Sequence, residues 1–232
     1  MIPAFIIWLI RQYRQTENKK QFIWIIIQKI NSRITQILAF VLLAGFLLLG
    51  FNTLAQTKQL NYQIIRGGNS IGSLHFTEVK EADITQFLVE SEIKTRLIFS
   101  ITSQTRDEAT YYNGILLRSS VYRKQNGNEK VNKQINAGNN QYVIRSGDNS
   151  TISKTFPVTY NMLSLYAGEP VGIDQVFSDS FEQLIDIQKK EDHKYKIELP
   201  DGNYNYYCYE GGILNKVEVH HTLYSATIEL IK

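Results

Sequence analysis

The sequence is poor in cysteine and proline. It has one cysteine, Cys208, and four prolines among 232 residues. A single cysteine excludes a disulfide framework, so the stability of the fold must come from packing. No Pro-rich linker, internal repeat or low-complexity tract divides the chain. Residues 56–232 are therefore predicted to form one domain, which is long enough to bury a core of its own.

Motifs of several common enzyme classes are also missing. One G-x-S-x-G string occurs, Gly68–Gly72, but it lies between two predicted strands, where a nucleophile motif would need a following helix. Gly67 and Gly68 lie between two predicted strands, where a phosphate-binding loop would need a following helix. The sequence thus assigns no catalytic residue from a motif and implies no cofactor.

Long runs of positive charge are absent as well. The net charge is +3, but residues 1–55 hold six Lys or Arg and one Glu, whereas residues 56–232 hold 19 basic and 21 acidic residues. A domain close to neutrality without a basic cluster is not typical of nucleic-acid binding. We expect no nucleic-acid partner.

What the N-terminal part does have is an uncharged apolar run, Ile37–Phe51, preceded by Lys29 and Arg33. This length fits the hydrophobic region of a signal peptide and is shorter than the roughly 20 residues of a comfortable membrane span. Small residues occupy the −3 and −1 positions of a cleavage site between Ala55 and Gln56. The pattern predicts an exported, periplasmic or secreted protein.

An uncleaved leader is the alternative. Residues 34–54 would then anchor the protein in the inner membrane, and this would be its one contact with a membrane. The thirty residues ahead of the charged region fit neither interpretation, which leads to the hypothesis that translation starts near Ile30. The predicted organisation is an extension with a signal peptide or anchor at 1–55 and a β domain at 56–232.

Alternation with a period of two dominates the predicted domain. From Phe87 to Ile101 the odd positions are mostly apolar and the even ones include several charges, as expected of one long strand or of two with a slight break. Turn sequences rich in Gly and Asn separate such runs. We predict a mainly β fold with roughly nine to eleven antiparallel strands, curled into a barrel, half-barrel or sandwich.

A helix is expected at one place. Pro157 can open a short helix over Val158–Ala167. Residues 178–183 could add one helical turn. A hydrophobic helical leader would precede the whole sheet.

Three stretches carry a family resemblance: "LNYQIIRGGNSIGSLHFTE", "LYAGEPVG" and "DGNYNYYCYEGG". With the leader, they resemble a family of uncharacterised exported β-rich proteins of Gram-negative bacteria. The domain is more distantly similar to the half-barrels of periplasmic lipoprotein carriers. The resemblance implies a concave apolar surface, and its motifs concern turns and packing rather than catalysis.

Aromatic residues are abundant, with 14 Tyr and 11 Phe. They could line a binding groove, although Tyr is also a good strand former. The wall of a ligand site is assigned to Phe87, Val89, Phe99 and Tyr166, with Glu169 as the one polar member.

Glu169 precedes Pro170 after the predicted helix. One interpretation is a turn in which the carboxylate accepts backbone N–H bonds. The other is chemical: Glu169 with a second carboxylate, Asp174 or Asp179, could act as an acid–base pair in glycoside hydrolysis.

Cysteine and histidine give weaker signals. Cys208 is flanked by aromatic residues, which favours a small buried side chain over a reactive thiol. His220 and His221 are neighbours on a strand and must point to opposite faces, although Glu218 and His220 share one. A third ligand could come from elsewhere, but no spacing typical of a metal site occurs, so no metal is assigned.

Three functions remain open. The first is a non-enzymatic envelope module that binds an apolar or lipid-like ligand. The second is a structural or interaction protein with a filled core and an envelope protein as partner. The third is a hydrolase that uses Glu169 and a second carboxylate.

Overall fold

The computed structural model describes Arg11, Trp24, Gln28 and residues 55–96, 100–153 and 155–231. Residues 1–52 and 53–232 form two separate compact units. The apolar run of the predicted leader and the alternative anchor lie outside the described residues. Among the residues that are described, no helix combines the length and the apolar character needed to cross a bilayer.

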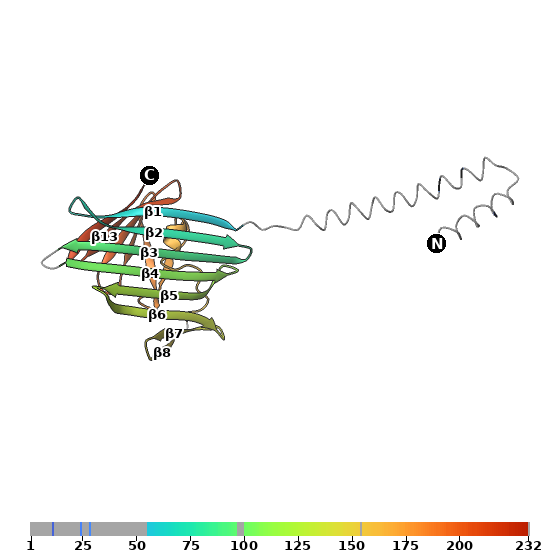
Figure 1. Cartoon of the computed structure of the whole chain (residues 1–232), viewed down its shortest axis with the longest axis horizontal. Coiled ribbons are helices and arrows are strands. Elements are labelled where there is room, and N and C mark those ends of the chain that lie inside the picture. The colour runs from blue at the N-terminus through green and yellow to red at the C-terminus, as the bar shows by residue number, and fades with distance from the viewer. Residues whose placement is uncertain are drawn as a thin grey trace. The chain divides into compact units, whose positions relative to one another are not determined.

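The second unit is a β domain (Figure 1). Its described residues form fourteen strands and one helix, α3, at Ser164–Ala167. The strands are β1 Gln56–Arg66, β2 Asn69–Glu81, β3 Ile84–Arg96, β4 Ser100–Tyr112, β5 Ile115–Gln125, β6 Asn128–Gly138, β7 Gln141–Ser146, β8 Asn149–Ser153, β9 Gln175–Ser178, β10 Gln183–Glu191, β11 Lys194–Glu198, β12 Tyr204–Glu210, β13 Ile213–His221 and β14 Tyr224–Leu230.

All fourteen strands belong to one antiparallel sheet in the order β8-β7-β6-β5-β4-β3-β2-β1-β14-β13-β12-β11-β10-β9. Apart from β8 and β9, strands that are neighbours in sequence pair as hairpins, and the first strand pairs with the last, with Tyr62 opposite Leu230. The sheet curls so that β13 and its neighbours pass behind β1–β6 (Figure 1). It does not close, because β8 and β9 form its two ends.

The predicted fold class is confirmed, and the structure selects an unclosed curled sheet among the shapes that were open. The strand count of nine to eleven was too low. One reason is the run from Phe87 to Ile101, in which β3 ends at Arg96 and β4 begins at Ser100. Another is the polar stretch from β5 to β8, where short hairpins follow one another without a strong apolar stripe.

The concave side of the sheet is filled by the chain itself. Residues 155–182, here called the inner segment, contain α3 and β9 and bury Val158, Leu165 and Phe177 almost completely. They pack against large side chains from both halves of the sheet, including Tyr62, Phe76, Leu116, Tyr142, Ile197 and Leu214. Apolar burial between the inner segment and the sheet is thus the main source of stability for the domain.

The predicted helix over Val158–Ala167 was too long. The Val158 carbonyl accepts a hydrogen bond from the Leu116 N–H, and the Val158 N–H donates to the Tyr142 hydroxyl. These contacts hold the backbone extended, so the helix occupies only Ser164–Ala167. The structure has no helix at 178–183: Ser178 ends β9 and Gln183 begins β10, and the turn between them is closed by a hydrogen bond from the Glu182 N–H to the Ser178 carbonyl at 2.7 Å.

The inner segment also covers one end of the sheet. The Phe177 N–H of β9 donates to the Tyr160 carbonyl, and the Phe177 carbonyl accepts from the Met162 N–H. The edge of β9 is therefore partly satisfied by its own chain. At the other end, β8 is a short polar strand, which reduces its tendency to pair with other molecules.

Candidate functional site

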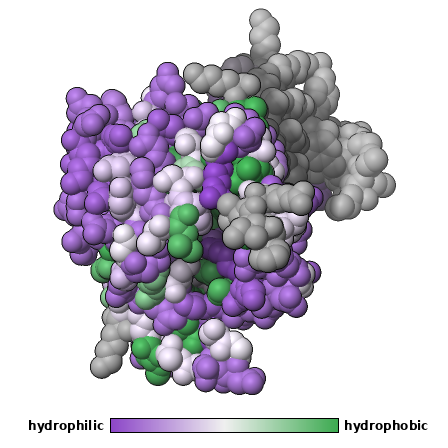
Figure 2. Space-filling model, turned by 90° about the vertical axis from the view of Figure 1, so that its left-hand side faces the viewer, coloured by the Kyte–Doolittle hydropathy of each residue, from purple (hydrophilic) through white to green (hydrophobic). Residues whose placement is uncertain are grey.

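Two cavities lie on either side of the inner segment. The first has a volume of about 240 Å³ and lies between β2–β5 and residues 162–181. The second, of about 340 Å³, lies near Gly168 and the opposite ends of β2 and β3. Figure 2 shows the domain from the side where β5 ends, and its surface there is mostly hydrophilic with small hydrophobic groups between.

One wall of the first cavity is apolar. Leu74 of β2, Val89 of β3 and Tyr166 of α3 line it, together with Met162 and Leu199. The ring of Tyr166 is stacked on that of Phe76, with 5.9 Å between the centroids. Because β2 and β3 alternate, Leu74 and Val89 face inward with the core, and this wall is fixed by packing on both sides.

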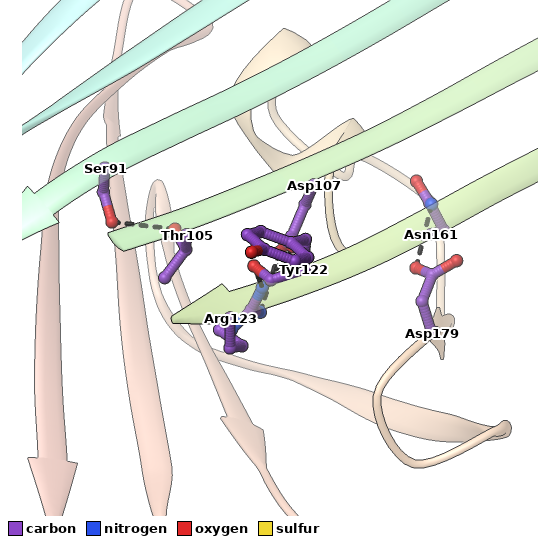
Figure 3. A network of polar contacts seen from close by, with 7 residues as sticks. All are labelled: Ser91, Thr105, Asp107, Tyr122, Arg123, Asn161 and Asp179. Carbon is purple, nitrogen blue, oxygen red and sulfur yellow. Dashed lines mark hydrogen bonds and ion pairs between the residues drawn. The ribbon is translucent and has the colours of Figure 1, made fainter. Parts of the chain in front are cut away.

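The sheet side of the first cavity also carries an ion pair, beside Val89, which is the cross-strand partner of Asp107. Asp107 of β4 and Arg123 of β5 face the same side of the sheet, and both nitrogens at the end of the Arg123 guanidinium bind the carboxylate, one of them at 2.8 Å (Figure 3). The side chain of Asp107 is 15% exposed. This two-point geometry is the strong form of an Arg–carboxylate pair.

A second carboxylate lines the same cavity. Asp179 lies in the turn after β9 and is 3% exposed. Ser119 donates to one of its oxygens, and the Asn161 side chain donates to the other at 3.0 Å (Figure 3). Burial raises the pKa of Asp179 to about 6; the Ser119 bond opposes this rise and the charge of Asp107 adds to it. Asp179 is thus a buried acid held by neutral donors.

Further hydrogen bonds tie this carboxylate to the helix. The Ser164 hydroxyl donates to the Asn161 side-chain oxygen at 3.2 Å and lies 3.3 Å from the Tyr111 hydroxyl. Among the described residues, every buried polar side-chain atom has a hydrogen-bond partner. The network fixes α3 and the turn after β9 against β4 and β5.

The second cavity contains Glu169. Its carboxylate accepts a hydrogen bond from the Tyr195 hydroxyl at 2.7 Å and lies 3.0 Å from Nδ1 of His193. Burial raises the pKa of Glu169, but the bonds from Tyr195 and His193 outweigh it, and the pKa is lowered. The prediction that this carboxylate accepts backbone N–H bonds was wrong, because side chains of the β10–β11 hairpin bind it instead.

The structure divides the predicted ligand residues between the two cavities. Val89 and Tyr166 line the first, whereas Phe87 and Glu169 line the second. Phe99 lies outside the described residues. A role in ligand binding stays a prediction for all five.

The predicted cleavage site lies at the start of the β domain. Ala55 is the first residue of the described stretch, and Gln56 opens β1; both are exposed. Whether a protease cleaves between them stays a prediction.

The hydrolase hypothesis needs Glu169 and a second carboxylate in one cleft. Asp179 lines the first cavity and Glu169 the second, so the structure does not bring these two into one cavity. Glu78 shares the second cavity, where it is ion-paired with Lys80.

Cys208, His75 and His220 line neither of these two cavities. Cys208 is half-buried on the outer face of β12, where burial raises the pKa of its thiol. On the same face His220 stacks on Tyr204, with 4.6 Å between ring centroids. His75 contacts Asn61. In the part of the chain that is described, no three His, Cys, Asp or Glu side chains are placed to hold a metal ion.

Sequence reasoning missed Asp107 and Arg123. The signal was available: Asp107 alternates with Ala109 and Tyr111 on the inner face of β4, and Arg123 shares the inner face of β5 with Val121. A charged residue within each of two adjacent apolar stripes indicates an inward-facing pair. Nothing in the sequence pairs Ser119 or Asn161 with Asp179, because these residues meet only in the folded chain.

Comparison with solved structures supports the fold. The crystal structure of a beta-barrel-like protein of domain of unknown function DUF1849 from Brucella abortus is similar, with a TM-score of 0.50 and 11% sequence identity. The match covers 77% of this chain and 97% of that one. At this identity the likeness concerns the curled sheet alone.

No curated protein matches the chain. The predicted export and Gram-negative origin stay predictions. The sequence pattern of one domain family matches residues 62–231, which is most of the chain. The chain therefore belongs to the family of the domain of unknown function DUF6134.

Proposed function

We propose that the β domain is a non-enzymatic binding module of the cell envelope, exported through its leader, and that it holds a small, partly apolar ligand in the first cavity. The observation that carries this proposal is the composition of that cavity. Apolar side chains of Leu74, Val89 and Tyr166 and the Asp107–Arg123 ion pair line one cavity of about 240 Å³.

This combination is typical of ligand sites, which are mostly apolar and contain a few fixed polar groups that orient the ligand. The volume lies just below the usual range of about 300–1,000 Å³ for such sites. The inner segment occupies the rest of the concave side, so the space suits a small or single-chain ligand better than a lipid with two chains.

The polar groups near the cavity support binding more than catalysis. Ser119 is 5% exposed and donates to Asp179, which is itself 3% exposed. A nucleophile must reach the substrate and needs a base beside it. Here the hydroxyl is buried and its partner is a carboxylate shared with Asn161.

A second candidate function, docking of an envelope protein, is favoured by a patch on the outer face. Ile84, Tyr112 and Ile115 are opposite one another on three adjacent strands, and all are exposed, as is the nearby Leu117. Their inward neighbours Tyr111 and Leu116 are buried. Clustered exposed apolar residues are typical of interaction surfaces.

The test is native mass spectrometry of the full-length protein, purified from the envelope fraction of its own cells. We expect a small molecule to co-purify with the wild type and to be lost from Met162→Trp, in which the larger side chain fills the first cavity. Thr159→Trp, which places the same ring at the second cavity, is the matched control and should retain the molecule. A protein free of small molecules, or equal retention by both variants, would contradict the proposal.

A further inference from the structure

The charges that line the first cavity do not balance. Its charged lining residues, within the described chain, are Asp107, Arg123 and Asp179. Arg123 is committed to Asp107 through two contacts. Of the side chains that the structure describes, no cationic one contacts Asp179, whose side-chain partners are the neutral Ser119 and Asn161.

The other charges close to this turn are already paired with each other. Lys133 of β6 donates to the Ser180 carbonyl at 2.7 Å and pairs with Glu182, also at 2.7 Å. Asp179 is therefore left as the one uncompensated charge of the cavity lining.

An uncompensated carboxylate selects the charge of a ligand. Removing a carboxylate from water is costly unless an opposite charge and further hydrogen bonds compensate it. A carboxylate offers about four acceptor positions, and the two bonds from Ser119 and Asn161 leave some of these free. A ligand ammonium could use them, whereas a carboxylate or phosphate would be repelled.

The remaining dimensions fit a short molecule. A volume of about 240 Å³ holds roughly eight groups of the size of a water molecule, at about 30 Å³ each. The apolar lining residues provide the contact for a short hydrocarbon body, and Asp179 lines the same cavity.

Resting on the proposed function, we propose that the first cavity takes a small primary amine with a short apolar body, and that the carboxylate of Asp179 is the counter-ion of its ammonium group. Asp107 and Arg123 then act as an ion pair without net charge, so Asp179 determines which charge of the ligand is favoured.

The experiment compares three probes that differ only in their polar end: hexylamine, 1-hexanol and hexanoate. Each is titrated calorimetrically into the full-length protein at pH 7.5. We expect hexylamine to bind about tenfold more tightly than hexanol, the factor typical of one hydrogen bond to a charged group. Hexanoate should bind more weakly than hexanol.

Two variants locate the effect. Asp179→Asn retains the shape and removes the charge, so hexylamine should lose its advantage while hexanol binds as before. Asp186→Asn is the matched control, because Asp186 is exposed on β10 and contacts Gln175 outside the cavity. It should leave all three affinities unchanged.

If Asp179→Asn does not fold, the same test can be made on the wild type by measuring the affinities for hexylamine and hexanol at several pH values. The groups that face Asp179 are Asp107 of β4, Ser119 of β5 and Asn161 of the inner segment, with Arg123 on the same wall. Protonation of Asp179 near pH 6 removes the counter-ion, so hexylamine affinity should fall below that pH while hexanol affinity stays constant.

The outcomes separate the two proposals. If hexylamine and hexanol bind equally at pH 7.5, the amine inference is overturned and the proposed binding function stands. If hexanoate binds best, the inference is overturned as well. If none of the probes binds to the wild type, both the inference and the proposed site fail.

Discussion

Two carboxylates of the inner segment, Asp179 and Glu169, lie ten positions apart in the chain and meet opposite environments. Asp179 is buried between β4, β5 and the inner segment, and its pKa is raised to about 6. Glu169 lies at the second cavity beside His193 and Tyr195, and its pKa is lowered. The same element thus carries one acid that loses its charge easily and one that keeps it.

The difference between the two pKa values comes from the groups that contact each carboxylate, and not from burial alone. The side chain of Glu169 is only 9% exposed in the fold, yet a phenol and an imidazole bind its carboxylate. Asp179 also receives two hydrogen bonds, but a second carboxylate, Asp107, lies on its cavity wall. A neighbouring charge and the depth of burial decide which form of a carboxyl group the fold prefers.

The largest expected change in stability comes from deleting a core side chain that holds the inner segment, and with it both carboxylates, against the sheet. Phe177 is fully buried between the inner segment and the sheet, and its ring packs against Tyr142. Phe177→Ala should lower the free energy of unfolding by about 3–5 kcal/mol, the range for a deleted buried aromatic ring.

Denaturant unfolding of this variant should be followed by circular dichroism. Both tryptophans, Trp8 and Trp24, lie in residues 1–52, so tryptophan fluorescence does not report on the β domain. A loss below about 1 kcal/mol would mean that the inner segment is not held by the core as described.

The second prediction concerns the dependence of stability on pH. Because the pKa of Asp179 is raised on folding, its ionisation costs stability above about pH 6, and the cost vanishes below its usual value of 3.8. The full rise corresponds to about 3 kcal/mol. Asp179→Asn should therefore be more stable than the wild type at pH 8, by up to about 3 kcal/mol, and similar to it at pH 4.

Urea unfolding of both proteins at the two pH values measures this difference. Asp186→Asn serves again as the control with an exposed carboxylate. A difference between Asp179→Asn and the wild type that is the same at both pH values would show that Asp179 does not titrate as described.

A smaller effect is expected from the donors of Asp179. Ser119→Ala removes one of its two hydrogen bonds and leaves a buried charged oxygen without a partner, which should cost about 2 kcal/mol at pH 7.5. The pKa of Asp179 should rise further, as carboxyl carbon shifts in NMR would show. Ser120→Ala is the control on the same strand, since Ser120 faces the other side of the sheet. Equal losses in the two variants would contradict the assigned role of Ser119.

The sequence was sufficient to predict the sheet but not its contents. Alternation predicted an apolar face at the odd positions from Phe87 onward, and the structure buries Phe87 and Val89. Alternation is a local property, so one sequence reveals it. It gave the antiparallel fold and much of the inner face.

The filling of the concave side was not predictable in this way. The inner segment has no long helical or alternating pattern, and Val158 is held by backbone bonds to residues far away in sequence. Asp179 likewise meets Ser119 over 60 positions. Contacts of this kind depend on how the curled sheet closes over the segment, which no local pattern specifies. For this reason the predicted ligand wall was divided between two cavities.

The smallest expected effect belongs to Glu169 and completes the comparison. Its pKa is lowered on folding, so its ionised form stabilises the fold above its usual pKa of 4.5, and this contribution is lost as the pH falls through the lowered value. Glu169→Gln should reduce stability at pH 7.5 by no more than about 1 kcal/mol, because its partner His193 is exposed to solvent. The pKa of Tyr195 gives a clearer readout. Burial raises the pKa of this phenol to about 12, and the Glu169 carboxylate adds to the rise. The variant should lower that pKa, which ultraviolet titration of the phenolate measures. An unchanged Tyr195 titration would show that the side chains of Glu169 and Tyr195 are not coupled.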